Sequence, residues 1–111
     1  MITTHVLNTA LGQPASGMEV LLEMRRGTDW VRISSGRTDL HGRLALTASA
    51  TSDAGVYRLT FDTVDYYRAV RTAAFYPEIQ VTFIAGGDGE HVHLPLLLSP
   101  FGYSTYRGTA L

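Results

Sequence analysis

The sequence predicts an all-β protein, a two-sheet β-sandwich of seven or eight strands with one short helix. Short runs in which apolar and polar residues alternate recur along the chain, and clusters of Gly, Pro, Asn, Asp and Ser separate them. Strands of this kind at regular spacing are typical of sandwiches. The 111 residues contain no internal repeat and no linker-like segment, so we expect a single domain, residues 1–111.

The first third of the chain is predicted to contain three strands. Thr3–Asn8 is short and β-branched, and a loop rich in turn-forming residues follows it. Glu19–Arg25 places alternate apolar residues on one face, which we expect to lie in the core: Val20, Leu22 and Met24. Gly27–Asp29 turns the chain and Trp30–Arg37 returns, so residues 19–37 form a predicted hairpin.

A polar turn over residues 38–43 follows this hairpin. Its Gly42 is suited to a positive backbone φ, and the turn delivers Arg43 to the beginning of another short strand. Residues 48–55 are small and polar, which indicates a loop. The clear alternation in Val56–Asp62 then predicts a strand.

One helix is expected, over Thr63–Thr72. Thr63 is its expected capping residue. Its apolar face is imperfect and consists of Val64, Tyr67, Ala69 and Val70.

The last third is predicted to hold a second hairpin and a terminal strand. In Pro77–Ala85 one face carries the apolar residues Ile79, Val81 and Phe83. The turn signal in residues 86–89 predicts that this strand pairs with Glu90–Leu98 as a hairpin. Residues 99–102 interrupt the apolar run, and Tyr103–Arg107 forms a short final strand.

Composition excludes several classes of function. The net charge is -1 and the basic residues are scattered, so we expect no nucleic-acid partner. The longest apolar stretch, Leu94–Leu98, is far shorter than the roughly 20 residues of a membrane-spanning helix. The first residues show no secretion signal, so the expected compartment is the cytoplasm. Cysteine is absent, which excludes disulfides, thiol nucleophiles and thiolate metal sites.

The residues that carry chemistry include four histidines, which are His5, His41, His91 and His93. His91 and His93 are two positions apart on a predicted strand, so their side chains share a face. Such a pair can bind zinc, but no cysteine and no acidic residue at ligand spacing completes a tetrahedral site, so we expect no metal or other cofactor. Taken alone, these residues favour simpler interpretations: a solvated sheet face at His91 and His93, a half-buried His5, and Arg43 as a solvated charge or part of a structural ion pair. An ordinary amphipathic terminal strand would equally account for Tyr103, Tyr106 and Arg107.

Three separated motifs identify a family. His5-Val6-Leu7-Asn8 with Gly12-Gln13-Pro14-Ala15, Thr38-Asp39 with Gly42-Arg43, and His93 to Pro100 leading to Tyr103 to Gly108 together resemble the 5-hydroxyisourate hydrolases, transthyretin-related enzymes of urate catabolism. The resemblance runs from about residue 3 to 109. It implies two four-stranded sheets, a dimer formed by edge-to-edge strand pairing, and a homotetramer in which two dimers enclose a channel with the active sites.

The resemblance also implies the site residues. His5, Arg43 and His93 would be catalytic, and the terminal segment Tyr106, Arg107, Gly108 and Thr109 would bind substrate. This chain departs from the family pattern at its end, because threonine replaces the usual terminal serine and two residues, Ala110 and Leu111, follow it. They would move the terminal carboxylate away from the site.

The implied reaction is hydrolysis of 5-hydroxyisourate to 2-oxo-4-hydroxy-4-carboxy-5-ureidoimidazoline. His5 would take a proton from water and His93 would position substrate or protonate the leaving nitrogen, and the reverse assignment fits equally well. Arg43 would stabilise the negative charge that develops on the carbonyl oxygen. His91 neighbours this set without belonging to it, and His41 is expected to be exposed in its turn. The alternatives are a non-catalytic transthyretin-like protein that binds a small ligand and a purely structural sandwich.

Overall fold

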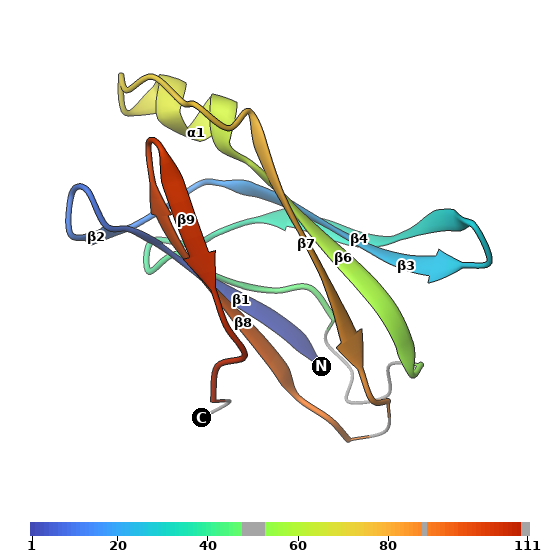
Figure 1. The fold of residues 1–111 in the computed structure, drawn as a ribbon. Coiled ribbons are helices and arrows are strands. Elements are labelled where there is room, and N and C mark those ends of the chain that lie inside the picture. The colour runs from blue at the N-terminus through green and yellow to red at the C-terminus, as the bar shows by residue number, and fades with distance from the viewer. Residues whose placement is uncertain (48–52, 88, 110–111) are drawn as a thin grey trace.

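A computed structural model describes residues 1–47, 53–87 and 89–109, and in these ranges the chain forms a two-sheet sandwich with one helix (Figure 1). In chain order the elements are β1 (Ile2–Asn8), β2 (Gln13–Pro14), β3 (Glu19–Arg26), β4 (Asp29–Arg37), β5 (Arg43–Ala45), β6 (Gly55–Asp62), α1 (Thr63–Ala69), β7 (Glu78–Ala85), β8 (Val92–Ser99) and β9 (Gly102–Thr105). The predicted fold class is confirmed. The two-residue β2 is an addition that the sequence pattern did not predict.

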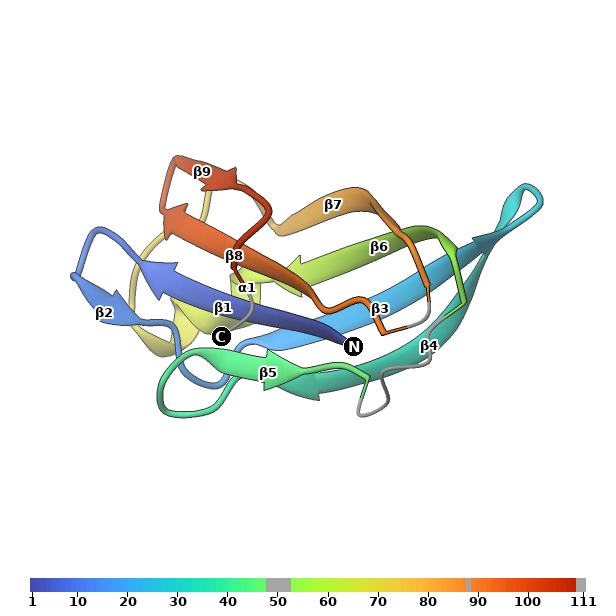
Figure 2. The same ribbon diagram turned by 90° about the horizontal axis from the view of Figure 1, so that it is seen from below.

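The two sheets lie face to face (Figure 2). One has the order β4-β3-β6-β7 and the other the order β2-β1-β8-β9, with β5 also paired to β1. β2 and β5 share one edge of β1, where β5 pairs with Thr3 to His5 and β2 with Leu7 and Asn8. The second sheet therefore has five strands, where the resemblance implied four. β1 and β8 are parallel, and every other pairing is antiparallel.

The core lies between the sheets and follows the predicted alternation. Val20, Leu22 and Met24 of β3 are buried, as expected. Ile79 of β7 is buried, and its predicted face-sharing partners Val81 and Phe83 pack against the core from partly buried positions. The largest fully buried side chains come from both sheets and include Phe61, Leu59, Leu96, Leu98 and Val6. Burial of these apolar surfaces is the main favourable contribution to folding.

The predicted hairpin of residues 77–85 with 90–98 is wrong. β7 pairs with β6, whereas β8 pairs with β1 and β9, so the glycine-rich segment connects one sheet to the other. Gly87 and Gly89 have φ of 101° and 72°, which a reversal of the chain requires. Asp88 in this segment lies outside the described residues. A turn signal predicts that the chain reverses, but it does not specify which strand becomes the partner.

Helix α1 differs from its prediction at both ends. Its cap is Asp62, whose carboxylate accepts a hydrogen bond from the backbone N–H of Asp65 at 3.3 Å. Thr63 is instead buried, and its hydroxyl donates to the backbone carbonyl of Tyr76. The helix ends at Ala69, and Tyr66 and Tyr67 supply its buried aromatic face. The expected contribution of Ala69 and Val70 is wrong, because both are exposed.

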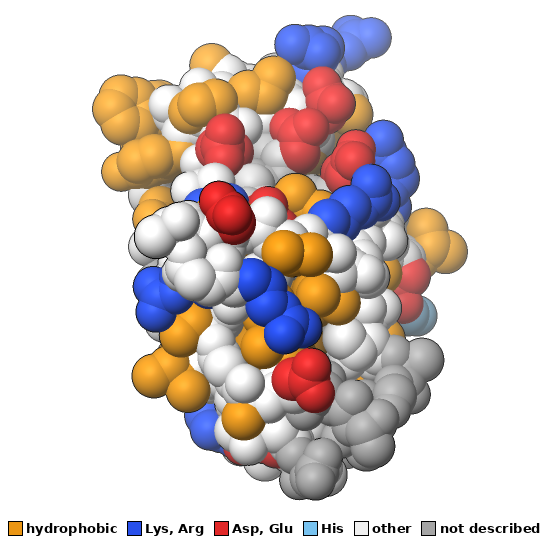
Figure 3. All heavy atoms as spheres, turned by 90° about the vertical axis from the view of Figure 1, so that its right-hand side faces the viewer, with side chains coloured by type: hydrophobic (Ala, Val, Ile, Leu, Met, Phe, Trp, Pro, Cys, Tyr) orange, Lys and Arg blue, Asp and Glu red, His pale blue; other side chains and the backbone are white. Residues whose placement is uncertain are grey.

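The outer surface carries charges of both signs. Figure 3 shows acidic and basic side chains interspersed on one face of the molecule, with no large patch of either sign. The best-shielded ion pair joins Arg58 of β6 to Glu23 of β3 at 2.7 Å, and the same guanidinium lies 4.2 Å from the centre of the Trp30 ring. In the described ranges no helix is long and apolar enough to cross a membrane.

Candidate active site

Strand register places the predicted catalytic residues on one face of one sheet. His5 of β1 lies directly opposite Arg43 of β5, and Thr3 of β1 lies directly opposite His93 of β8. Directly paired residues share a face, and so do residues two positions apart on a strand. This face points away from the core, because the alternate residue Thr4 is buried. The fold thus brings together His5, Arg43 and His93, as the resemblance implied.

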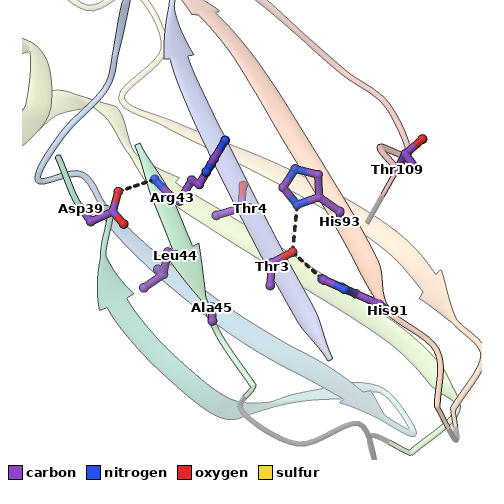
Figure 4. Close-up of a pocket in the computed structure, with 9 residues that line it drawn as sticks. All are labelled: Thr3, Thr4, Asp39, Arg43, Leu44, Ala45, His91, His93 and Thr109. Carbon is purple, nitrogen blue, oxygen red and sulfur yellow. Dashed lines mark hydrogen bonds between the residues drawn. The ribbon is translucent and has the colours of Figure 1, made fainter. Parts of the chain in front are cut away.

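A cavity of about 570 Å³ opens on this face (Figure 4). Its volume is within the range of about 300–1,000 Å³ that is usual for small-molecule sites. The residues that line it are Thr3, Thr4, Asp39, Arg43, Leu44, Ala45, His91, His93 and Thr109. Three segments far apart in the chain, at β1, β5 and β8, therefore form its walls.

His5 lies on the same sheet face, opposite Arg43, but is not among the residues that line the cavity, and its ring has a defined proton position. Its Nε2 lies 2.9 Å from the backbone carbonyl oxygen of His41. A carbonyl oxygen only accepts hydrogen bonds, so Nε2 of His5 carries a proton and donates it. A neutral His5 therefore accepts a further proton only at Nδ1. The side chain of His41 takes no part, because His41 is exposed in its turn, as expected.

Asp39 holds the turn that delivers Arg43. Its Oδ1 accepts hydrogen bonds from the backbone N–H groups of His41 at 2.8 Å and Arg43 at 2.9 Å. These two bonds, the one from Arg43 first, hold the pKa of the Asp39 carboxyl below its usual value. Among the described residues no salt bridge ties the guanidinium of Arg43 to a carboxylate. The turn thus fixes the backbone of Arg43 and leaves its charge available at the cavity.

Asp39 was not among the predicted site residues, although a signal for it exists. An aspartate at the start of a turn commonly accepts N–H groups two or more residues further on. The same turn needs Gly42, which has φ of 76° and whose backbone carbonyl accepts the N–H of Val6 at 2.8 Å.

Replacing Gly42 by alanine tests this close approach. A Cβ at Gly42 would lie 2.4 Å from the backbone oxygen of Val6. We expect a loss of about 2–4 kcal/mol in the free energy of unfolding, from the left-handed backbone and from overpacking together. Urea denaturation measures this loss in the free energy of unfolding. The matched control is Gly12→Ala, because Gly12 has φ of 67° and nothing within 4 Å. Equal losses in the two variants would contradict the close-approach argument.

His93 is partly buried and contacts both Gly108 and Thr3. The N–H of Gly108 donates to its backbone carbonyl at 2.8 Å, and Nδ1 of its ring lies 2.8 Å from the hydroxyl of Thr3. A Cβ at Gly108 would lie 2.8 Å from the His93 ring, so glycine permits the C-terminal segment to pass this closely. Burial first, then the charges of His5, His91 and Arg43, lower the pKa of His93 from its ordinary value of 6.5. The lowered pKa favours the neutral form of His93 at pH 7.

The predicted substrate-binding segment is divided between two hollows. Thr109 lines the cavity and Gly108 packs against His93. Tyr106 and Arg107 line a second hollow of about 210 Å³ beside β7, which His93 also lines, and the Arg107 guanidinium lies 3.4 Å from the Glu90 carboxylate. The structure does not bring these two side chains into the cavity. The expected effect of Ala110 and Leu111 concerns residues that lie outside the described part of the chain.

Thr3 is a second residue at this site, after Asp39, that the sequence did not predict. Its hydroxyl lies 2.8 Å from Nε2 of His91 and 2.8 Å from Nδ1 of His93. The sequence feature that could have indicated Thr3 is its position two residues before His5, on the same face of the predicted strand. The predicted sharing of a face by His91 and His93 is confirmed, and their ring centres are 6.5 Å apart. In the described residues no group of three or more His, Cys, Asp or Glu side chains is arranged to hold a metal ion.

Comparisons with known proteins identify the family and agree with the fold. A model of the HIUase/Transthyretin family matches residues 2–108. A 5-hydroxyisourate hydrolase of Salmonella dublin is 41% identical over 110 residues, covering 98% of this chain and 81% of that protein. The structure of Klebsiella pneumoniae 5-hydroxyisourate hydrolase has a TM-score of 0.84 at 33% identity, covering 97% of this chain and 98% of that one. Sea bream transthyretin in complex with thyroxine has a TM-score of 0.91 at 31% identity, covering 98% and 95%.

Proposed function

The chain belongs to the HIUase/Transthyretin family, and from that membership we propose that it hydrolyses 5-hydroxyisourate to 2-oxo-4-hydroxy-4-carboxy-5-ureidoimidazoline. Relatives named 5-hydroxyisourate hydrolase that match nearly its whole length support an enzyme of this type. The observation that carries the proposal is the arrangement of His5, Arg43 and His93 on one face beside an open cavity.

The reaction adds water to a ring carbonyl and breaks the adjacent carbon–nitrogen bond. A base must remove one proton from the water, a cation or donor must stabilise the charge on the carbonyl oxygen, and the leaving nitrogen must gain a proton. Arg43 supplies the cation, since a guanidinium remains charged throughout the accessible pH range. The two histidines remain for the proton transfers and for orienting the substrate.

The roles of the two histidines follow from their protonation. The lowered pKa of His93 favours its neutral form, and its Nδ1 is engaged by Thr3, so Nε2 is the atom that takes the proton from water. His5 presents Nδ1 because its Nε2 donates to a backbone carbonyl. We therefore prefer His93 as the base and His5 as the group that orients substrate, the reverse of the assignment preferred from the sequence.

The dependence of the rate on pH tests His93 as the base. Because the pKa of His93 is lowered from 6.5, kcat/KM is expected to fall with decreasing pH around a midpoint below 6.5. The same shift affects stability, because the unfolded chain binds a proton at His93 more readily than the folded chain does. The stability that His93 contributes is therefore present above pH 6.5 and is lost as the pH falls through the lowered pKa of the folded chain. A rate that stays flat from about pH 8 to about pH 5 would contradict a histidine base.

We propose that the active form is a homotetramer built as a dimer of dimers. β7 and β9 are edge strands of their sheets, and nearby apolar side chains are exposed, with Ile84 at 77% and Tyr103 at 44%. Such edges are templates for pairing with another chain. Sedimentation is expected to give a mass of four subunits, and the double variant Ile84→Lys, Tyr103→Lys is expected to dissociate and lose activity. A fully active monomer would contradict the proposal.

The decisive experiment follows the ultraviolet absorbance of freshly generated 5-hydroxyisourate. We expect the protein to accelerate its loss well beyond spontaneous decay. The second candidate is a carrier without turnover, which the similarity to sea bream transthyretin with bound thyroxine favours. Absence of acceleration, together with saturable thyroxine binding in calorimetry, would favour the carrier over the enzyme.

A further inference from the structure

We propose that Thr3 and His91 are positioning residues that form a proton relay with His93, so that His93 alternates between base and acid during one turnover. This inference rests on the proposed function for its chemistry. The hydrogen-bonded chain from His91 through Thr3 to His93 can also be tested by itself.

The relay rests on one oxygen atom between two rings. The hydroxyl of Thr3 lies 2.8 Å from His91 Nε2 and 2.8 Å from His93 Nδ1, and Figure 4 shows both rings directed at it from β8 and the segment before it. Strand pairing fixes Thr3 from both sides, because Ala45 of β5 and His93 of β8 are its direct partners. The hydroxyl is therefore held between the two imidazoles.

Counting protons shows that the two rings are coupled. A hydroxyl has one proton to donate and two lone pairs to accept with. When Thr3 donates to one ring nitrogen, the other ring nitrogen must carry a proton and donate to Thr3. Two bare nitrogens facing this oxygen would leave one of them without a partner. The protonation of His93 Nδ1 therefore depends on that of His91 Nε2.

The coupling suits a base that later acts as an acid. At the start, His93 Nδ1–H donates to Thr3, Thr3 donates to a bare His91 Nε2, and His93 Nε2 is free to accept. When Nε2 takes the proton from water, the Nδ1 proton moves to Thr3 and the Thr3 proton moves to His91, which then carries the positive charge. His93 next gives its Nε2 proton to the leaving nitrogen, and both relay protons return. One proton has passed from water to the leaving nitrogen.

The surroundings of His93 disfavour a charge that remains there. The charged and titratable groups that act on it are His5 of β1, Arg43 of β5 and His91, and it is also partly buried. Each of these effects opposes an imidazolium at His93. Passing the charge through Thr3 to His91 removes it from this position.

The test uses the full chain with ¹⁵N-labelled histidine rings, whose nitrogen shifts report which ring atom carries the proton. In the unaltered protein, His93 Nδ1 and His91 Nε2 are expected to change protonation together over one pH range. In Thr3→Val, which keeps the side-chain shape and removes the hydroxyl, the two rings are expected to titrate separately. Thr3→Ser is expected to restore the joint titration. Thr28→Val, in the exposed β3–β4 turn, is the matched control and is expected to change nothing.

Kinetics provide the second readout. Thr3→Val is expected to lower kcat on the order of 10- to 100-fold, as loss of a partner that fixes a histidine tautomer does, with a much smaller change in KM. Thr3→Ser is expected to recover most of the rate. Separate titration of the two rings in the unaltered protein, or joint titration that persists in Thr3→Val, would overturn the relay. Unaltered protein that shows joint titration and no turnover would refute the proposed function and leave the coupled pair standing.

Discussion

His93→Gln is expected to lower kcat for 5-hydroxyisourate hydrolysis by about 10²- to 10⁴-fold, the contribution of a positioned acid–base group. Glutamine keeps a polar side chain of similar length, but its amide neither takes nor gives a proton near pH 7. The variant retains the backbone carbonyl that accepts the N–H of Gly108, so the C-terminal segment is expected to stay in place. Absorbance decay of the substrate measures the rate.

The matched control is His41→Gln. It removes a histidine whose side chain is exposed, while its backbone carbonyl still accepts the hydrogen bond from His5. We expect the rate of this variant to stay close to that of the unaltered protein. A His93→Gln rate within a few-fold of this control would remove His93 from the chemical step. Far-ultraviolet circular dichroism of both variants separates a loss of chemistry from a loss of fold.

The largest expected effect on stability belongs to Phe61→Ala. Phe61 of β6 is 0% exposed and is the largest of the fully buried side chains between the sheets. Truncating a buried phenylalanine removes its transfer free energy and leaves a cavity, and together these cost about 3–5 kcal/mol. Domains are commonly stable by only about 5–15 kcal/mol, so the variant is expected to lose a large share of its stability. Urea denaturation at fixed protein concentration measures the loss.

Phe101→Ala is the control for this loss. Phe101 follows β8 and is 74% exposed, so the same chemical change removes little buried surface there. We expect a change within about 0.5 kcal/mol, as for most surface substitutions. Similar losses in the two variants would contradict the assignment of the core to the space between the sheets.

The sequence predicted strands better than it predicted their partners. Alternation along residues 19–25 and 77–85 follows from a property of each strand alone, namely which face is apolar, and both predictions are confirmed. Pairing depends on the whole sheet. β7 and β8 are neighbours in the sequence and were therefore predicted to pair, but they belong to different sheets. The helix cap was misplaced by one residue because Asp62 and Thr63 are both residue types that favour capping.

The candidate site was predictable only through motifs. No local pattern shows that His5 and Arg43 are direct partners across β1 and β5, since this depends on the register of two strands far apart in the chain. Thr3 and Asp39 were not predicted as site residues for a related reason. Each acts through a hydrogen bond to another site residue, and hydroxyls and carboxylates are too common in strands and turns to identify such a bond from sequence.

The parallel pairing of β1 with β8 determines when the site can appear during synthesis. The sheet β4-β3-β6-β7 comes from residues 19–85, with β5 of the other sheet between β4 and β6, whereas the sheet with the cavity joins its first long strand to its last two. On the ribosome, where chains lengthen by about 5–20 residues each second, β1 emerges first and has no long partner until β8 follows. We therefore expect a nascent chain to form the sheet β4-β3-β6-β7 before the other sheet. His93 can then join His5 and Arg43 only after β8 has left the exit tunnel.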